Sequence, residues 1–300
     1  MAGGAALQPR QPAGALAPCG DPVPDTVISI LQDAYGEDVG RVGPGSQGHG
    51  ADSCSCQRSS VACSGACLVY GELLPSGCAR ALRRLGLTGS GAAEGARGTL
   101  LELGMGTGKV ALQAFVQCPQ LAQVVGVELS QPRFALAAAA LRRLAGARPG
   151  DFRLLPDCDE AGERGRGPAH RCLLEACGGS EAAGPGPRIL DLRCGDFLAR
   201  HVVTDEEFQG AEAILLQLCL PPDALVKTQQ RLSAVQDGCR LFSLCDLRLK
   251  WRLAQPSHFH AWQRGDIAGQ EEDESKDRYA TSWAATYGMT FHTFRVSRAH

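Results

Sequence analysis

The sequence contains no long uninterrupted run of hydrophobic residues. Nowhere in its 300 residues do about 20 consecutive apolar side chains follow one another, the length that a membrane-spanning helix needs. The N-terminus also lacks the charged region and apolar run of a secretory signal. We therefore expect a soluble, intracellular protein without a membrane partner.

An excess of charge of either sign is also missing. The formal net charge is −2, so the surface as a whole has no general attraction for phosphate, and we expect no strong sequence-specific DNA binding. Aromatic residues make up only 5%, whereas the 37 glycines gather in stretches typical of loops. We expect the 14 cysteines to be reduced thiols, because a chain of this length needs no disulfide staples.

Composition divides the chain into three parts. Residues 1–22 hold Ala, Gly, Pro and Gln without apolar periodicity and predict a disordered leader. Residues 23–97 contain two segments with helical spacing, separated by a Gly/Ser/Cys-rich loop. Residues 98–300 carry the core, and the polar, glycine-rich residues of about 145–187 predict an insertion between core elements.

Strand-like and helix-like segments alternate along this core. Thr99 to Leu103 predicts a buried strand, the next segment a helix, and Val124 to Leu129 a second strand, which completes a βαβ unit. Further strands are predicted at residues 189–192, 213–220 and 240–245, with a helix between the last two. Residues 281–296 predict two antiparallel strands around a turn at Tyr287-Gly288. The fold class is therefore α/β: a doubly wound, mostly parallel sheet with an antiparallel C-terminal hairpin.

A glycine turn with Gly104, Gly106 and Gly108 follows the first core strand directly. Glycines let a ligand approach the backbone, and the helix after them presents free N–H groups and the positive end of its dipole. Such a turn can hold a pyrophosphate or the carboxylate of a methionine moiety. The spacing G-x-G-x-G and the acidic Glu102 just before it disfavour the pyrophosphate, because a carboxylate repels it but suits an ammonium group.

Two further acidic residues extend this pattern. Glu128 closes the second strand, where a carboxylate accepts hydrogen bonds from ribose hydroxyls. Asp196 follows the strand after the insertion and offers a carboxylate for an adenine amino group, beside Phe197 as a stacking face. Together these residues favour S-adenosylmethionine as the cofactor. The alternative is an ordinary tight strand-to-helix connection with surface acids.

Four segments of the chain resemble the disruptor-of-telomeric-silencing histone-lysine methyltransferases, which do not use a SET domain. They are Val69-Tyr70-Gly71-Glu72, Glu102 to Val110 with Gln113, Gly126-Val127-Glu128 and Gly195-Asp196-Phe197-Leu198. Ser282-Trp283 and His292-Thr293 are similar to the closing hairpin of that family.

The resemblance carries its own set of expectations. It implies a seven-stranded methyltransferase sheet and a loop that covers the cofactor with Tyr70 and Glu72. It places Lys109 with the three glycines among the residues that bind the cofactor. It also implies a nucleosome or histone partner, a lysine of the histone H3 globular core as acceptor, and a nuclear location with a role in chromatin regulation.

The chain departs from this family after the fourth predicted core strand. Where the family has paired Asn followed by aromatic residues, the sequence reads Leu216-Gln217-Leu218 and then continues to two prolines. Gln217 falls at the second Asn position, and we expect it to be the catalytic residue, which orients the cofactor where methyl transfer takes place. Trp283 and Tyr287 are expected to wall the substrate channel.

Three other interpretations stay open. The chain could be a methyltransferase of the same fold that acts on another protein or a small molecule, or a catalytically silent cofactor-binding module. Cys54, Cys56, Cys63 and Cys67 could ligate zinc, but their spacing matches no established ligand pattern, and we expect no metal site.

Overall fold

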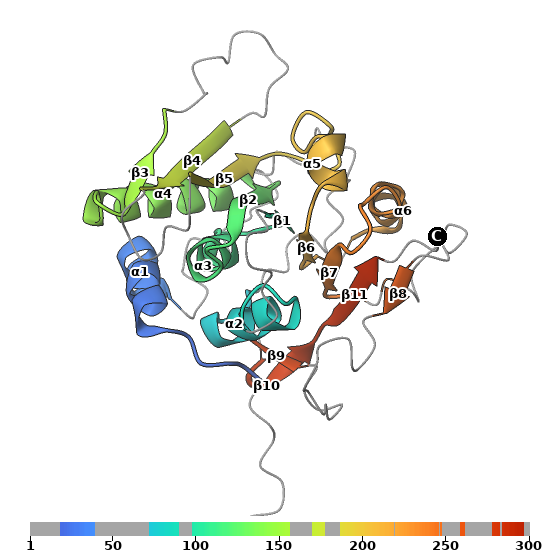
Figure 1. Ribbon diagram of the computed structural model, residues 1–300, viewed down its shortest axis with the longest axis horizontal. Coiled ribbons are helices and arrows are strands. Elements are labelled where there is room, and N and C mark those ends of the chain that lie inside the picture. The colour runs from blue at the N-terminus through green and yellow to red at the C-terminus, as the bar shows by residue number, and fades with distance from the viewer. Residues whose placement is uncertain are drawn as a thin grey trace, which may run out of the picture.

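The computed structural model of the 300-residue chain describes its helices and strands and the loops between most of them (Figure 1). The described residues are 19–39, 72–89, 98–156, 170–177, 187–218, 220–245, 247, 259–261, 278–282 and 284–296. In this part of the chain, no helix has the length and apolar character to cross a membrane.

A nine-stranded sheet forms the centre of the molecule, in the order β3-β4-β5-β2-β1-β6-β7-β11-β8. Its parallel strands are β1 (Gly98–Leu103), β2 (Leu121–Glu128), β5 (Arg188–Cys194), β6 (Ala213–Leu216) and β7 (Arg240–Ser243). At one edge, β11 (His292–Val296) runs antiparallel between β7 and β8 (Phe259–Ala261). The predicted fold class is thus confirmed, and two additional strands extend the expected seven.

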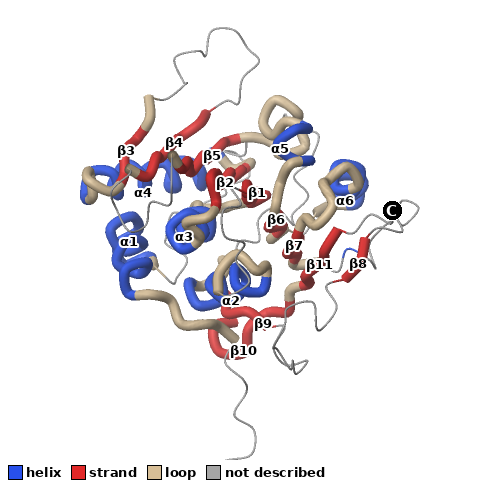
Figure 2. Tube along the Cα trace, viewed as in Figure 1, coloured by secondary structure: helices blue, strands red, loops and turns tan. Residues whose placement is uncertain are grey.

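Helices cover both faces of this sheet (Figures 1 and 2). They are α1 (Asp25–Tyr35) with the short η1 (Gly36–Asp38), α2 (Pro75–Arg84), α3 (Lys109–Gln117), α4 (Gln131–Ala147), α5 (Asp205–Gln209) and α6 (Pro222–Leu232). Side chains alternate across a strand, so Leu100 of β1 packs in the layer with α1 to α4, whereas Leu101 packs in the layer with α5 and α6. A central strand buried on both faces explains the unbroken apolar run that predicted it.

The expected insertion contains two strands that belong to the sheet. β4 (His170–Ala176) pairs antiparallel with β5, and β3 (Phe152–Leu154) pairs antiparallel with β4. Alternate residues of β4, namely Cys172, Leu174 and Ala176, are buried. The prediction that this region holds no core element is therefore wrong for these strands, because the short apolar segment of β4 is flanked by the charged Arg171 and Glu175 and by polar, glycine-rich sequence.

The C-terminal hairpin is present, with a different turn from the one expected. Its strands are β9 (Arg278–Thr281) and β10 (Ala284–Thr290), so Tyr287-Gly288 lies inside β10 and not at the turn. Gly288 has a φ of 66° and lies close to an irregularity in the pairing of β10 with β9. The glycine that this irregularity contains is the residue that predicted a turn. The following strand, β11, leaves the hairpin and joins the main sheet.

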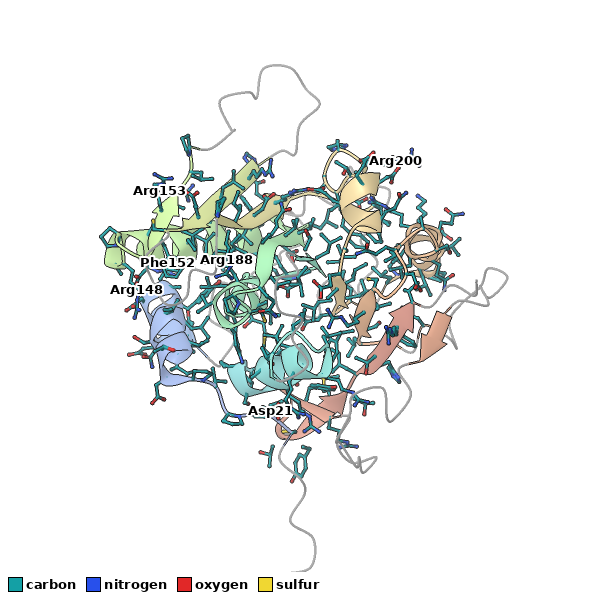
Figure 3. The ribbon with its side chains drawn as sticks, viewed as in Figure 1. Asp21, Arg148, Phe152, Arg153, Arg188 and Arg200 are labelled. Carbon is teal, nitrogen blue, oxygen red and sulfur yellow. The ribbon has the colours of Figure 1, made fainter. Side chains whose placement is uncertain are left out.

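The end of the expected leader packs against the rest of the molecule. Cys19 is buried, and its carbonyl oxygen accepts a hydrogen bond of 2.7 Å from the backbone N–H of Ala280. Asp21, which Figure 3 labels, forms an ion pair with Arg83 of α2. The prediction of disorder is wrong for residues 19–22, and residues 1–18 lie outside the described part.

Candidate active site

The carboxyl ends of four adjacent parallel strands carry the polar residues that the sequence singled out. Glu102 is the penultimate residue of β1 and Glu128 the last of β2, while Asp196 is the second residue after β5 and Gln217 the first after β6. The strands lie in the order β5-β2-β1-β6, so these residues follow one another along one edge of the sheet. This edge is where ligands bind in open α/β sheets.

The glycine turn between β1 and α3 has the conformation that requires glycine. Gly104, Gly106 and Gly108 all have positive φ, at 86°, 59° and 79°. The N–H groups of Gly104 and Met105 donate to the carbonyl oxygen of Val127, which ties the turn to β2. A Cβ atom on Gly104 would lie 2.5 Å from the side chain of Leu218. Both this steric clash and the positive φ therefore disfavour any residue other than glycine at this position.

Glu128 holds the turn from the neighbouring strand. Its two carboxylate oxygens accept hydrogen bonds from the backbone N–H groups of Gly106, at 2.8 Å, and Ser130, at 2.7 Å. Burial raises the pKa of this carboxyl group, although the backbone hydrogen bonds and nearby Arg133 oppose the shift. Each oxygen of a carboxylate has a second lone pair, so Glu128 can still accept hydrogen bonds from ribose hydroxyls.

Glu102 is a buried carboxylate with one oxygen in use. Its Oε1 accepts a hydrogen bond of 3.0 Å from the side-chain amide of Gln217, whereas its buried Oε2 has no hydrogen-bond partner. Burial, followed by the nearby carboxylate of Glu72, raises the pKa of Glu102 well above its usual range. A positively charged group that reached Oε2 would satisfy the oxygen and stabilise its charge.

Glu72 lies beside the glycine turn, and its expected contact with the cofactor stays a prediction. Its carboxylate accepts a hydrogen bond from the hydroxyl of Thr107 and one of 2.8 Å from the ammonium group of Lys109. Its backbone exchanges two hydrogen bonds with Ser282, after the end of β9. Tyr70, the other expected residue of this loop, lies outside the described residues.

A small cleft joins these groups at the mouth of the turn. Its lining residues come from the turn, α3, the loop after β6 and the segment before α2: Glu72, Glu102, Gly104, Met105, Gly106, Lys109, Val110 and Gln217. Two carboxylates and one ammonium group therefore face the same space. This charge pattern suits a ligand that carries both an ammonium and a carboxylate group.

Asp196 and Phe197 lie at the start of the loop between β5 and α5. The Oδ1 atom of Asp196 accepts a hydrogen bond of 2.9 Å from the N–H of Leu198, and the N–H of Gly195 donates to the carbonyl oxygen of Glu128. Phe197 is buried in the apolar layer that also contains Phe208. The contact of Asp196 with adenine and the stacking of Phe197 stay predictions.

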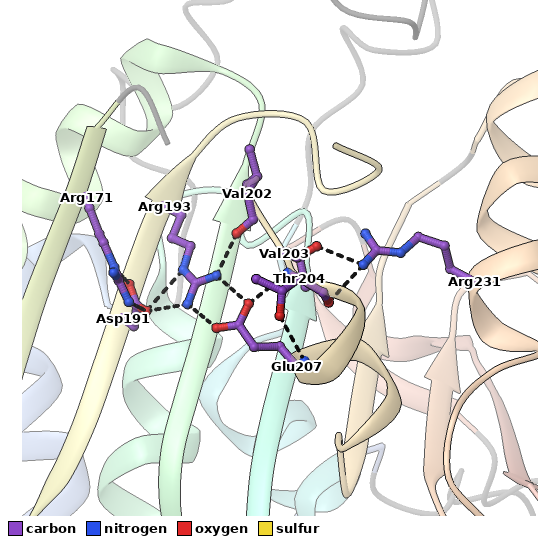
Figure 4. A network of polar contacts seen from close by, with 8 residues as sticks. All are labelled: Arg171, Asp191, Arg193, Val202, Val203, Thr204, Glu207 and Arg231. Atoms are coloured by element: carbon purple, nitrogen blue, oxygen red, sulfur yellow. Dashed lines mark hydrogen bonds and ion pairs between the residues drawn. The ribbon is translucent and has the colours of Figure 1, made fainter. Parts of the chain in front are cut away.

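Two arginines hold this loop through its carbonyl oxygens (Figure 4). Arg193 of β5 donates to Val202 at 2.6 Å and forms ion pairs with Asp191 and Glu207. Arg231 of α6 donates to the carbonyl oxygens of residues 197, 203 and 204. The sequence analysis missed this network, since only the Thr204 to Glu207 capping box has a recognisable spacing.

The remaining expected residues lie away from the described cleft or outside the described part. Tyr287 of β10 is 63% exposed, and Trp283 lies outside the described residues, so the channel wall stays a prediction. Cys54, Cys56, Cys63 and Cys67 also lie outside them. Among the residues that the structure describes, no group of three or more His, Cys, Asp or Glu side chains could hold a metal ion.

Comparison with known proteins assigns no family to the chain. No protein-family model matches it, and no curated protein matches it. Similar solved structures include an O-methyltransferase from Bacillus cereus in complex with SAH, at 12% identity over 92% of each chain with a TM-score of 0.42. Another is the rRNA methyltransferase aviRa from Streptomyces viridochromogenes, at 13% identity over 88% of this chain and 91% of that one, with a TM-score of 0.40.

A third is an S-adenosylmethionine-dependent O-methyltransferase from Thermotoga maritima, at 10% identity over 76% of this chain and 67% of that one, with a TM-score of 0.41. The chain spans about half the length, or less, of two other solved structures that it resembles, covering 53% and 35% of them. At TM-scores below 0.5 and identities of at most 13%, these likenesses identify neither a reaction nor a substrate for this chain.

Proposed function

We propose that the chain is an S-adenosylmethionine-dependent methyltransferase. One observation carries the proposal: Glu102, with an unpartnered buried oxygen, and Lys109 face one cleft, and Glu128 follows on the next strand. The cleft thus has an acceptor for an ammonium group and a donor for a carboxylate at the methionine end. Next to it lies a carboxylate for ribose hydroxyls.

Glu102, Lys109 and Glu128 suit the methionine end and the ribose of this cofactor. Oε2 of Glu102 would accept from its ammonium group, and the ammonium group of Lys109 would bind its carboxylate. Glu128 would bind the ribose, and Asp196 the adenine amino group. When bound, the cofactor supplies an electrophilic methyl group on a sulfonium centre.

The acceptor that we propose is a lysine of the histone H3 globular core on the nucleosome. This proposal rests on the resemblance of the segments around Glu72, Glu102, Glu128 and Asp196, and the nuclear location rests on it too. Methyl transfer needs a neutral amine held in line with the methyl group. Leu218 and Leu220, beyond Gln217, pack on the apolar layer of α6, and an apolar wall favours the neutral amine by desolvation.

One observation favours a different acceptor or a silent module. The side-chain amide of Gln217 donates to Glu102, so in this structure that N–H is engaged with a cofactor-site residue and not with a substrate. The family's paired Asn are absent from this segment of the sequence. A protein or small-molecule acceptor other than histone would need neither a substrate contact from Gln217 nor the paired Asn.

The test is an incubation of the purified chain with radiolabelled S-adenosylmethionine and three acceptors: nucleosomes, free core histones and a mixed protein extract. Label on a core histone only in the nucleosome sample supports the histone proposal. Label on other proteins identifies a different acceptor, and binding without any transfer supports the silent module. Absence of cofactor binding would contradict the methyltransferase proposal itself.

A further inference from the structure

Tyr35, which the sequence analysis left without a role, reaches the glycine turn from outside the sheet. It is the last residue of α1 and is 8% exposed. Its hydroxyl donates a hydrogen bond of 2.9 Å to the backbone carbonyl oxygen of Thr107, between Gly106 and Gly108. The same hydroxyl would lie 3.4 Å from a Cβ atom on Gly108. The phenol is thus in contact with the centre of the turn.

The helix that presents Tyr35 is itself fixed on α4. Arg143 donates to the carbonyl oxygen of Ala34, one residue before the tyrosine, at 2.8 Å. Arg148, at the end of α4, forms a 2.5 Å ion pair with Asp33 (Figure 3). It also donates to the hydroxyl of Ser29 at 2.6 Å. Tyr35 therefore projects from a helix whose last turns are held by two arginines.

The phenol is suited to donate at every physiological pH. Burial, then the carboxylates of Glu72 and Glu102, raises the pKa of Tyr35 well above its usual range, which keeps its proton in place. The ammonium group of Lys109 lies 5.6 Å from the centre of its ring, within reach of a cation–π interaction. Tyr35 thus contacts the turn and the cation of the cleft.

We propose that Tyr35 is a positioning residue for cofactor binding, which fixes the glycine turn through Thr107 and makes α1 part of the site. This inference rests on the proposed function. Thr107 is held from two sides, by Tyr35 on its carbonyl oxygen and by Glu72 on its hydroxyl. The position of Thr107 in turn determines where the neighbouring N–H of Gly106 and the side chain of Lys109 lie.

The test is the Tyr35→Phe variant, which removes one hydroxyl and keeps the ring. The change removes the hydrogen bond from the phenol to the carbonyl oxygen of Thr107, so the Kd for S-adenosylmethionine should rise about tenfold. Thr228→Val is the matched control, because it also removes a buried hydroxyl that donates to a backbone carbonyl, at 2.8 Å within α6. Its Kd should equal that of the wild type.

A second measurement separates this inference from the proposed function. Hydrogen exchange of the peptide from Gly104 to Lys109, in the protein without ligand, should be faster in Tyr35→Phe and unchanged in Thr228→Val. Unchanged exchange and unchanged Kd in Tyr35→Phe would overturn the inference. A wild type that fails to bind S-adenosylmethionine would refute the proposed function, and the exchange data would still decide whether Tyr35 fixes the turn.

Discussion

Replacement of Glu102 by Gln should raise stability and weaken cofactor binding at the same time. The carboxylate is 1% exposed, and its Oε2 has no hydrogen-bond partner. Burial and the charge of Glu72 raise its pKa, so the folded protein bears a cost for this group at neutral pH. Glutamine keeps the shape of the side chain, and its carbonyl oxygen can still accept from Gln217, but it removes the charge.

The two effects have opposite signs and measurable sizes. Relief of a buried, unpaired charged oxygen should stabilise the protein by about 1–3 kcal/mol, or about 2–4 °C in Tm for each kcal/mol. Because the folded pKa is raised, this advantage should appear only as the pH rises above about 4.3, the unfolded value. Loss of a charged hydrogen bond to the cofactor ammonium, about 1.5–3 kcal/mol, should raise the Kd roughly tenfold to 150-fold.

Thermal unfolding across a pH series and calorimetric titration with S-adenosylmethionine measure the two effects. The control is Glu175→Gln, which makes the same change on β4, where the carboxylate pairs with exposed Arg153. Its Kd should stay at the wild-type value. A Glu102→Gln variant that is less stable than the wild type and binds the cofactor equally well would refute this account of the site.

Three further variants test other parts of the structure. Glu128→Ala should abolish binding and cost about 1–3 kcal/mol in the free energy of unfolding, because two buried N–H groups lose their acceptor; a stable variant with normal affinity would argue against this role. Gly104→Ala should lose binding even beside Leu218→Ala, since the second change removes the clash but not the strain of a positive φ. Burial raises the pKa of Glu207, but its hydrogen bond and ion pair with Arg193 outweigh burial and lower the pKa overall. Glu207→Gln should therefore reduce the free energy of unfolding in urea at pH 7. The difference from the wild type should fade as the pH falls below about 4, and a pH-independent difference would contradict this role.

The centre of the fold could be predicted from the sequence because its signals are local. A buried parallel strand such as β1 is apolar throughout, and the glycines after it have no other physical explanation than a turn with positive φ. Glu102 and Glu128 were found because each stands at the end of such a strand. Parallel pairing then brings the strand ends together, whatever the loops contain.

The edges of the fold were harder to predict for a physical reason. β4 carries the charged Arg171 and Glu175 on its half-buried face and lies within a polar stretch, so its buried Cys172 and Leu174 do not stand out. The loop with Asp196 depends on Arg193 and Arg231, which bind its carbonyl oxygens. Backbone oxygens are present at every residue, so no side-chain pattern marks them as partners.

Tyr35 illustrates the same limit inside the site. Its helix was predicted from apolar spacing, but its contact with Thr107 joins residues 72 positions apart. Only the packing of α1 on α4 determines that the ring reaches the turn. The site thus includes a contribution from a segment that precedes the core in the chain.

Calorimetric titration of the purified chain with S-adenosylmethionine tests most directly whether this edge of the sheet binds the cofactor. One cofactor should bind per chain, with affinity lost in Glu128→Ala and reduced in Glu102→Gln. S-adenosylhomocysteine, the product, should compete for the same site. No heat of binding from either ligand, in a wild type with an intact cooperative unfolding transition, would contradict the assignment of this edge of the sheet as a cofactor site.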